Sequence, residues 1–257
     1  MIQAQGIAYK AGDKYLVQHI SSCFEPGMLN LVIGPNGAGK STFVKLLSGQ
    51  LQPHSGSVCY AGKPLKEYSI SQLARIRAVL SQNIELSFPL NVWEVVMMGR
   101  YPHFTGKPER KDIDACTEAM TFFNISDFAG RDYTTLSGGE KQRVQFARIM
   151  AQIWYPVPGS CRYLFLDEPL TFLDVHYQYE FMHQLLKLLS SGDLVIIGVV
   201  HDLNLASGYA HNITLLHNGN VLANGAPDAV LTPSNIKTAY HLDPSIISAN
   251  GKKYILF

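Results

Sequence analysis

Short apolar runs alternate with helix-compatible segments along the chain. The runs at 28–34, 162–169 and 193–202 each end in glycine or in polar residues, which is typical of buried strands in a layered α/β domain. The segment 40–49 has apolar residues at helical spacing and closes on a glycine, which predicts a helix directly after the first strand. Because open α/β sheets bind ligands beyond the carboxyl ends of their strands, we expect the functional residues at these polar ends.

The middle of the chain has a different pattern. From residue 91 to about residue 153, helix-compatible stretches follow one another without a strand pattern between them. We interpret this as a helical lobe at 91–153, inserted into a core formed by 1–90 and 154–257 of one domain. Further on, apolar runs flank Asn218 and Gly219, a pair that favours a tight β-hairpin. The predicted class is therefore α/β.

Composition limits the kinds of partner that we expect. The 257 residues include 21 Lys and Arg against 20 Asp and Glu, a net charge of +1 that offers no broad field for nucleic acid. The four cysteines are far apart and form no CxxC pair, which favours a reducing cytoplasm over a disulfide framework or zinc cluster. We find neither a signal-peptide core nor a run of the roughly 20 apolar residues that cross a bilayer. We therefore expect a partner to supply any membrane span.

A phosphate-binding loop follows the first predicted strand. The segment GPNGAGKS at 34–41 matches GxxxxGK[ST] and lies between a predicted strand and a predicted helix, a context that a plain glycine turn does not require. Glycines let backbone N–H groups close around phosphate, Lys40 reaches the terminal phosphates, and Ser41 is a ligand for Mg²⁺. The nucleotide-binding residues predicted here are Gly34, Pro35, Asn36, Gly37, Ala38, Gly39, Lys40, Ser41 and Thr42.

Two adjacent carboxylates, Asp167 and Glu168, follow the apolar run that begins at Arg162. In this position Asp167 suits the Mg²⁺ shell and Glu168 suits polarisation of the attacking water. An Asp-Glu pair after a strand is by itself more often an ordinary polar strand end. The phosphate loop favours the catalytic interpretation.

The string Leu136-Ser137-Gly138-Gly139-Glu140 matches the signature of ATP-binding-cassette (ABC) proteins, and the other motifs follow in that family's order. The chain therefore resembles ABC ATPases over nearly its whole length. The resemblance implies a P-loop NTPase cassette with a mixed, largely parallel core sheet, an antiparallel β subdomain and an inserted helical subdomain. Ser137 and the two glycines begin a helix, so a hydroxyl, N–H groups and the helix dipole face an anion. In the family this anion is the γ-phosphate of ATP held by a second copy.

Further roles follow from the resemblance alone. Tyr9 resembles the aromatic residue that stacks on adenine, with Tyr15 as the alternative. Gln82 resembles the glutamine that senses Mg²⁺ and water, and His201 the histidine that holds the γ-phosphate and the catalytic water. Asp174 resembles the aspartate of the loop that follows the catalytic glutamate. Taken alone, Tyr9 could equally be a core tyrosine, whereas Gln82 would more often be an ordinary loop amide and His201 a core histidine.

The same loop departs from the family pattern. Leu170 stands where the family usually has Ser or Thr, and Phe172 stands where it usually has a small residue. Because Asp174 is retained, we expect hydrolysis to survive. We expect Phe172 to lie at the subunit interface and to alter how tightly the dimer closes.

Residues 91–103 and 201–233 are similar to the branch that serves importers of vitamin B12, ferric siderophores and haem, and 99–103 with 151–160 are most similar to its haem importers. This resemblance implies a homodimer, two copies of an integral membrane permease, a periplasmic binding protein, and a position on the cytoplasmic face of the bacterial inner membrane. Trp93, Tyr101 and Phe104 are the expected permease anchors. An exporter ATPase is the closest alternative, and haem ligation by His103 is disfavoured because the predicted loop offers no apolar cleft.

Overall fold

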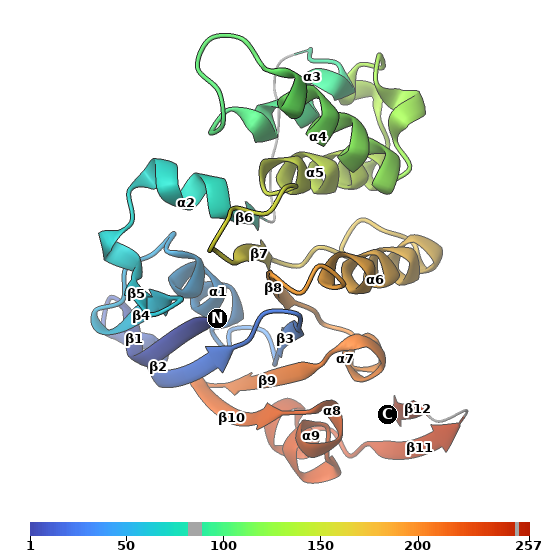
Figure 1. The fold of residues 1–257 in the computed structure, drawn as a ribbon. Helices are drawn as coiled ribbons and strands as arrows, with labels where there is room; N and C mark the ends of the chain where they lie inside the picture. The colour runs from blue at the N-terminus through green and yellow to red at the C-terminus, as the bar shows by residue number, and fades with distance from the viewer. Residues whose placement is uncertain (82–88, 250–251) are drawn as a thin grey trace.

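A six-stranded mixed sheet forms the centre of the computed structural model, which describes residues 1–81, 89–249 and 252–257 (Figure 1). The strand order is β10-β9-β3-β8-β7-β6, and each pair from β9 to β6 is parallel, while β10 is antiparallel to β9. The strands are β3 (Leu29–Ile33), β6 (Arg77–Leu80), β7 (Arg162–Leu166), β8 (Leu194–Val199), β9 (Asn212–His217) and β10 (Asn220–Gly225). Three buried strands predicted from apolar runs, β3, β7 and β8, are confirmed.

Helices cover both faces of this sheet. On one face, α1 (Lys40–Ser48) packs Phe43 and Leu47 against the sheet, and on the other α6 (Val175–Leu189) contributes Phe181 and Leu185. The remaining helices of the core are α2 (Ile70–Ile76), α7 (Leu203–Tyr209), α8 (Pro227–Val230) and α9 (Pro233–Tyr240). The predicted helix at 40–49 is thus confirmed, and it ends where Gly49 adopts a φ of 75°.

An antiparallel sheet lies beside α1, in the order β2-β1-β4-β5. Its strands are β1 (Ile2–Ala11), β2 (Lys14–Phe24), β4 (Ser55–Tyr60) and β5 (Lys63–Pro64). The rings of Phe24 in β2 and Phe43 in α1 lie 6.3 Å apart, so this sheet shares a core with the face of the central sheet that α1 covers. The arrangement places Leu16 of β2 against Gly39 of the phosphate loop.

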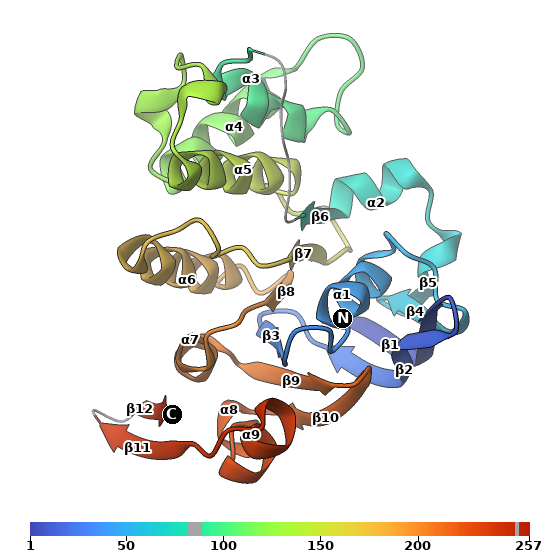
Figure 2. The ribbon, with the colours of Figure 1, turned by 180° about the vertical axis from the view of Figure 1, so that it is seen from behind.

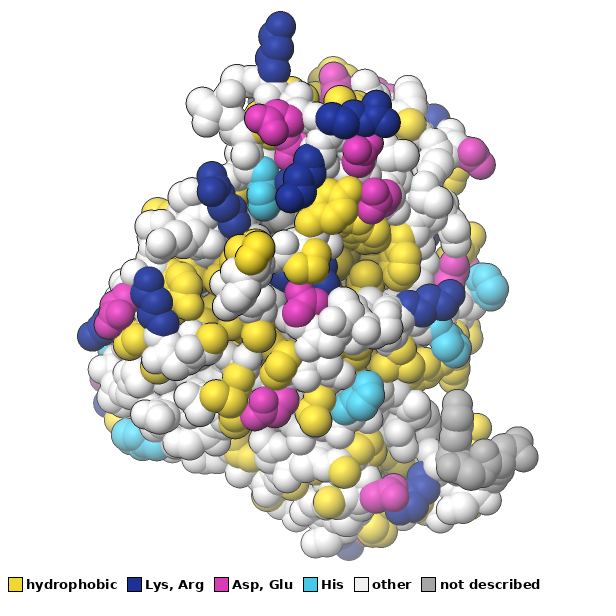
Figure 3. Space-filling view, in the orientation of Figure 1, with side chains coloured by type: hydrophobic (Ala, Val, Ile, Leu, Met, Phe, Trp, Pro, Cys, Tyr) yellow, Lys and Arg dark blue, Asp and Glu magenta, His cyan; other side chains and the backbone are white. Residues whose placement is uncertain are grey.

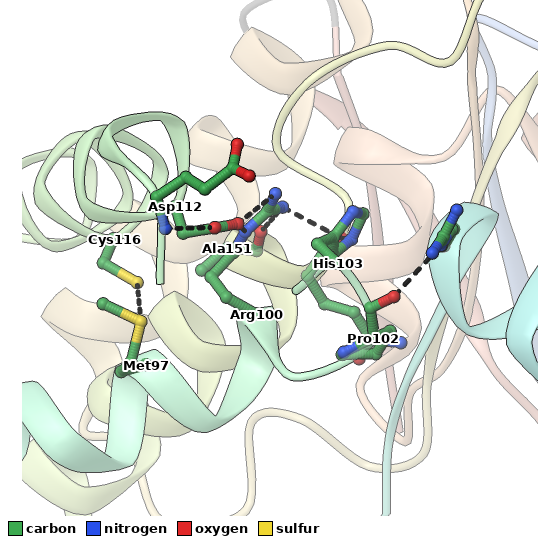
Figure 4. Close-up of polar contacts among 10 residues, drawn as sticks. Met97, Arg100, Pro102, His103, Asp112, Cys116 and Ala151 are labelled. Atoms are coloured by element: carbon green, nitrogen blue, oxygen red, sulfur yellow. Dashed lines mark hydrogen bonds and ion pairs between the residues drawn. The ribbon is translucent and has the colours of Figure 1, made fainter. Parts of the chain in front are cut away.

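Three helices, α3 (Val92–Met97), α4 (Arg110–Phe122) and α5 (Gly138–Gln152), form a separate lobe above the sheet in Figure 1. Buried Arg100 lies 2.9 Å from the Asp112 carboxylate and donates a 2.8 Å hydrogen bond to the Ala151 carbonyl, which joins α4 to the end of α5 (Figure 4). Gln152 donates to the carbonyl oxygens of Ala74 and Arg77 at 2.7 and 2.9 Å. The end of α5 therefore connects this lobe to the core.

Short elements complete the fold. They are the 3-10 helices η1 (Leu65–Glu67), η2 (Met98–Arg100), η3 (Ser126–Phe128) and η4 (Tyr133–Thr135), and a terminal hairpin of β11 (Ser245–Ala249) and β12 (Lys252–Leu256). This hairpin lies beside α7 in both ribbon views, where the Asn204 amide donates to the Ile255 carbonyl at 3.1 Å (Figure 2). The tight turn predicted at Asn218 and Gly219 is confirmed by φ angles of 48° and 77°. Within the described ranges, no helix combines the length and apolarity that crossing a membrane requires.

Candidate nucleotide site

The loop between β3 and α1 is pressed against neighbouring backbone, and this fixes its glycines. Gly34 and Gly39 have φ angles of 147° and 99°, and a Cβ added at either would overlap the carbonyl oxygen of Leu216 or of Leu16. Gly37 also has a positive φ, 77°, but faces open space. Only glycine satisfies both the angle and the close approach at positions 34 and 39. The loop is therefore a preformed cradle of backbone groups.

Lys40 lies inside this cradle. Its side chain is buried, and Nζ donates to the carbonyl oxygens of Gly34 and Pro35 at 2.9 and 3.0 Å. Burial lowers the Lys40 pKa, although the carboxylates of Glu168 and Asp167 act in the opposite direction. The ammonium group is thus held where it can exchange loop carbonyls for phosphate oxygens.

Two oxygen groups suited to a hard cation meet beside the loop. The Ser41 hydroxyl donates to Asp167 Oδ1 at 2.9 Å, and the Asp167 amide donates to the Leu80 carbonyl at 3.0 Å. Asp167 is buried, and this burial raises the pKa of its carboxyl group. A divalent cation would relieve the cost of the buried charge, and oxygen ligands of this kind fit Mg²⁺.

Glu168 and His201 follow the adjacent strands β7 and β8 and face each other. His201 Nε2 lies 2.9 Å from Glu168 Oε1. The phosphate loop follows β3, and β8 lies between β3 and β7 in the sheet. The ends of three neighbouring strands therefore bring these groups together. Asp167, Glu168 and His201, predicted from distant parts of the sequence, therefore gather with Lys40 in one place.

The signature residues lie at the start of α5, on the helical lobe. The Ser137 hydroxyl accepts from the Glu140 amide at 3.3 Å, and the Glu140 carboxylate accepts from the Ser137 amide at 2.8 Å, which forms a capping box. These bonds lower the Glu140 pKa, with the Ser137 amide as the largest cause. A Cβ on Gly138 would lie 3.7 Å from the Phe172 side chain. The helix start thus presents polar groups next to the segment that follows Glu168.

The remaining predicted residues differ in how closely they approach the site. The Tyr9 ring is partly buried, 4.9 Å from the His54 ring. Tyr15 is 39% exposed and directly precedes Leu16, whose carbonyl oxygen lies against Gly39. Both tyrosines therefore remain candidates for the adenine stack.

Asp174 caps α6, where its carboxylate accepts from the Tyr177 amide at 3.0 Å. This bond gives Asp174 a structural role in the chain itself. Gln82 lies outside the described residues.

Sequence reasoning missed the residues that support this site. The Gly219 amide donates to the Ala38 carbonyl at 3.1 Å, so the β9–β10 hairpin braces the phosphate loop. Gln142 Nε2 donates to the Pro169 carbonyl at 2.8 Å, and Thr171 Oγ1 to the Glu168 carbonyl at 3.0 Å. The Asn-Gly pair signalled the hairpin but not its position, and an isolated Gln or Thr gives no signal at all.

Comparison with known proteins adds independent findings. The family model described as "ABC transporter" matches residues 17–171. The hemin import ATP-binding protein HmuV of Escherichia coli O157:H7 is 42% identical over 96% of this chain and 94% of its own length. HmuV of Gloeobacter violaceus is 44% identical over 96% of this chain and 90% of its own length.

Solved structures share the fold. An inward-facing metal-chelate type ABC transporter chain superposes with a TM-score of 0.83 at 24% identity, covering 99% of this chain and 96% of its own. The dimeric ATP-binding cassette MJ0796, in a post-hydrolysis state bound to ADP and Pi, has a TM-score of 0.74 at 23% identity and covers 88% and 99%. The predicted α/β cassette fold is confirmed.

Proposed function

This chain belongs to the ABC transporter family of ATP-binding proteins, and we propose that it is the ATPase subunit that powers haem import through a separate membrane permease. The observation that carries the proposal is the convergence of Lys40, Asp167, Glu168 and His201 at three adjacent strand ends. The relatives named as hemin import proteins support the cargo, since they align with nearly the whole chain.

Each group in the site has a role that its chemistry allows. The loop amides and Lys40 bind the phosphates of ATP, and Ser41 with Asp167 would hold Mg²⁺, which neutralises charge on the phosphate oxygens. Glu168 polarises the attacking water. His201, 2.9 Å from that carboxylate, orients it and reaches toward the γ-phosphate. Lys40 and Asp167 are buried and held by hydrogen bonds, as preorganised electrostatic stabilisation requires.

A second copy completes the site. Ser137 caps α5 on the helical lobe, and Gly138 and Gly139 are its first residues, so a hydroxyl and first-turn amides can bind an anion there. We assign them to the γ-phosphate of the ATP that the partner copy holds, so two copies enclose two ATP molecules. The dimeric cassette among the structural neighbours supports this arrangement.

The permease contact lies on the helical lobe in this proposal. Tyr101 is 59% exposed and its ring meets Phe104 edge-on at 5.9 Å, as an anchor for an apolar partner would require. On the face drawn in Figure 3, hydrophobic side chains gather where the lobe meets the core. Trp93 packs partly into the lobe core, so it is the weaker anchor.

His103 has a different function from haem ligation. Its Nε2 lies 2.7 Å from the Gln152 carbonyl oxygen, and burial lowers its pKa. The side chain therefore supports the loop that carries Tyr101. The two permease copies, the periplasmic binding protein and the cytoplasmic face of the inner membrane complete the proposal, and nucleic acid has no part in it.

Growth of a deletion strain tests the cargo. Haem or a ferric siderophore is supplied as the sole iron source, or vitamin B12 as the sole cobalamin source. Plasmid-borne wild-type chain should restore growth on haem, and Lys40→Ala should not. Unchanged growth of the deletion strain on haem, with loss of growth on ferric siderophore or vitamin B12, would exclude haem as the cargo but would not contradict the role as a transport ATPase.

A further inference from the structure

The backbone at Glu168 is held in an unfavourable conformation. Its φ is +53°, in the left-handed region that residues with a Cβ rarely adopt. Such angles persist when the surrounding contacts determine them, and they are found at catalytic positions. The residues that hold this peptide therefore decide where the Glu168 carboxylate points.

Two side chains bind successive carbonyl groups after the Glu168 Cα, those of Glu168 and Pro169. Thr171 Oγ1 donates to the Glu168 carbonyl at 3.0 Å, from within the same turn. Gln142 Nε2 donates to the Pro169 carbonyl at 2.8 Å, and it reaches there from α5. Thr171 is a local contact, whereas Gln142 connects the turn to a helix of the other lobe.

Gln142 also lies within about one turn of the signature residues. Ser137 caps α5 and Gly138 is its first residue, so the helix that contacts the partner's ATP is the one that carries Gln142. The Phe172 side chain lies against Gly138 as a second contact between this helix start and the same segment. The start of α5 and the peptide of Glu168 are therefore joined at two points.

We propose that Gln142 is a positioning residue for Glu168: the signature helix of each chain holds the catalytic carboxylate of that same chain through the Pro169 carbonyl. This inference rests on the proposed ATPase function. It implies that the partner's ATP, bound at Ser137, adjusts Glu168 through one rigid helix. The two ATP sites of the dimer are then coupled inside each chain, because the signature of one site and the base of the other share α5.

The test compares two glutamines that make the same kind of bond. Gln142→Met removes the donor to Pro169 and keeps nearly the same side-chain length. Gln184→Met is the matched control. Gln184 lies on α6, and its Nε2 donates to the Phe122 carbonyl of α4 at 3.0 Å rather than to the turn at Glu168. We expect Gln142→Met to lower kcat on the order of 10- to 100-fold, as misplacement of a reacting group does, with KM for ATP nearly unchanged. The Hill coefficient for ATP should fall toward 1.

The control separates positioning from stability. Gln184→Met should lower the melting temperature by an amount similar to that for Gln142→Met while kcat stays near the wild-type value. If both variants lose stability equally and both keep kcat and the Hill coefficient, Gln142 is only a structural residue and the proposal is wrong.

A double-mutant cycle gives a second test with the other contact. Thr171→Val removes the bond to the Glu168 carbonyl. If Thr171 and Gln142 hold the same turn at Glu168 and Pro169, their effects on kcat should be clearly non-additive. Additive effects would contradict the proposal. As a control for the proposed function, the wild-type chain should hydrolyse ATP and Lys40→Ala should not. If either result fails, the proposed ATPase function is wrong, which is distinct from a failure of the role of Gln142.

Discussion

Two glycines of the phosphate loop allow a matched test of the fold at the site. Gly39→Ala forces a Cβ into the Leu16 carbonyl and also requires a φ of 99°. Gly37→Ala requires a φ of 77° but meets nothing within 4 Å. Both substitutions add one methyl group to the same loop, so their difference isolates the close backbone approach.

The expected magnitudes follow from these two geometries. The angle alone costs roughly 1 kcal/mol or somewhat more, which is all that Gly37→Ala should lose. Overlap with a backbone carbonyl adds roughly 1 to 3 kcal/mol, because both partners are main chain and neither can move aside cheaply. At about 2–4 °C per kcal/mol for a chain of this size, Gly39→Ala should melt several degrees below Gly37→Ala.

Thermal unfolding by calorimetry, without and with ATP, measures both effects. Gly39→Ala should also lose most of the stabilisation that ATP gives, because the cradle must open to accept the methyl group. Equal melting temperatures for the two variants, or undiminished ATP stabilisation of Gly39→Ala, would refute the preformed cradle.

Further predictions concern the shared site, the buried carboxylate and the permease contact. A mixed dimer of Ser137→Arg with Lys40→Ala chains should keep one intact composite site, so its ATPase rate should exceed that of either variant alone; no gain despite confirmed heterodimers would contradict shared sites. Asp167→Asn should abolish Mg²⁺-dependent hydrolysis yet raise the melting temperature of the nucleotide-free protein at pH 7, because a pKa raised above the ordinary 3.8 makes the ionised carboxylate destabilising. The difference in melting temperature should vanish as pH falls below 4, where the wild-type carboxyl group is protonated. Tyr101→Ala should uncouple transport and leave the ATPase rate of the free subunit unchanged, whereas Trp93→Ala should lower the melting temperature. Equal melting temperatures and equal transport rates for the two variants would contradict this difference between the two residues.

Much of the fold could be predicted because its central strands are fully buried. Leu194–Val199 is a continuous apolar run with polar ends, and Leu29–Ile33 is interrupted only by Asn30. Such runs can be recognised in a sequence without knowledge of partners. The terminal hairpin of β11 and β12 was not predicted. Among its described side chains only Ile255 is buried, and Asn204 binds its backbone, so no regular pattern marks it.

In the site, too, features set by a local sequence motif could be predicted, whereas features set by contacts with distant segments could not. Lys40 and Asp167 follow from short motifs whose spacing is fixed by one strand end each. The close approach of Leu16 and Leu216 to the loop depends on how separate strands stack, which no local string encodes. The positive φ at Glu168 could not be predicted either, because one of the contacts on its turn comes from Gln142, on a helix of the other lobe.

The measurement that tests the central account most directly is ATP hydrolysis and dimerisation by Glu168→Gln. The variant should bind ATP as the wild type does, hydrolyse it roughly 10²- to 10⁴-fold more slowly, as loss of a positioned base predicts, and elute as a dimer in gel filtration with ATP. Hydrolysis near the wild-type rate, or a monomer in the presence of ATP, would contradict the assignment of Glu168 in a shared ATP site.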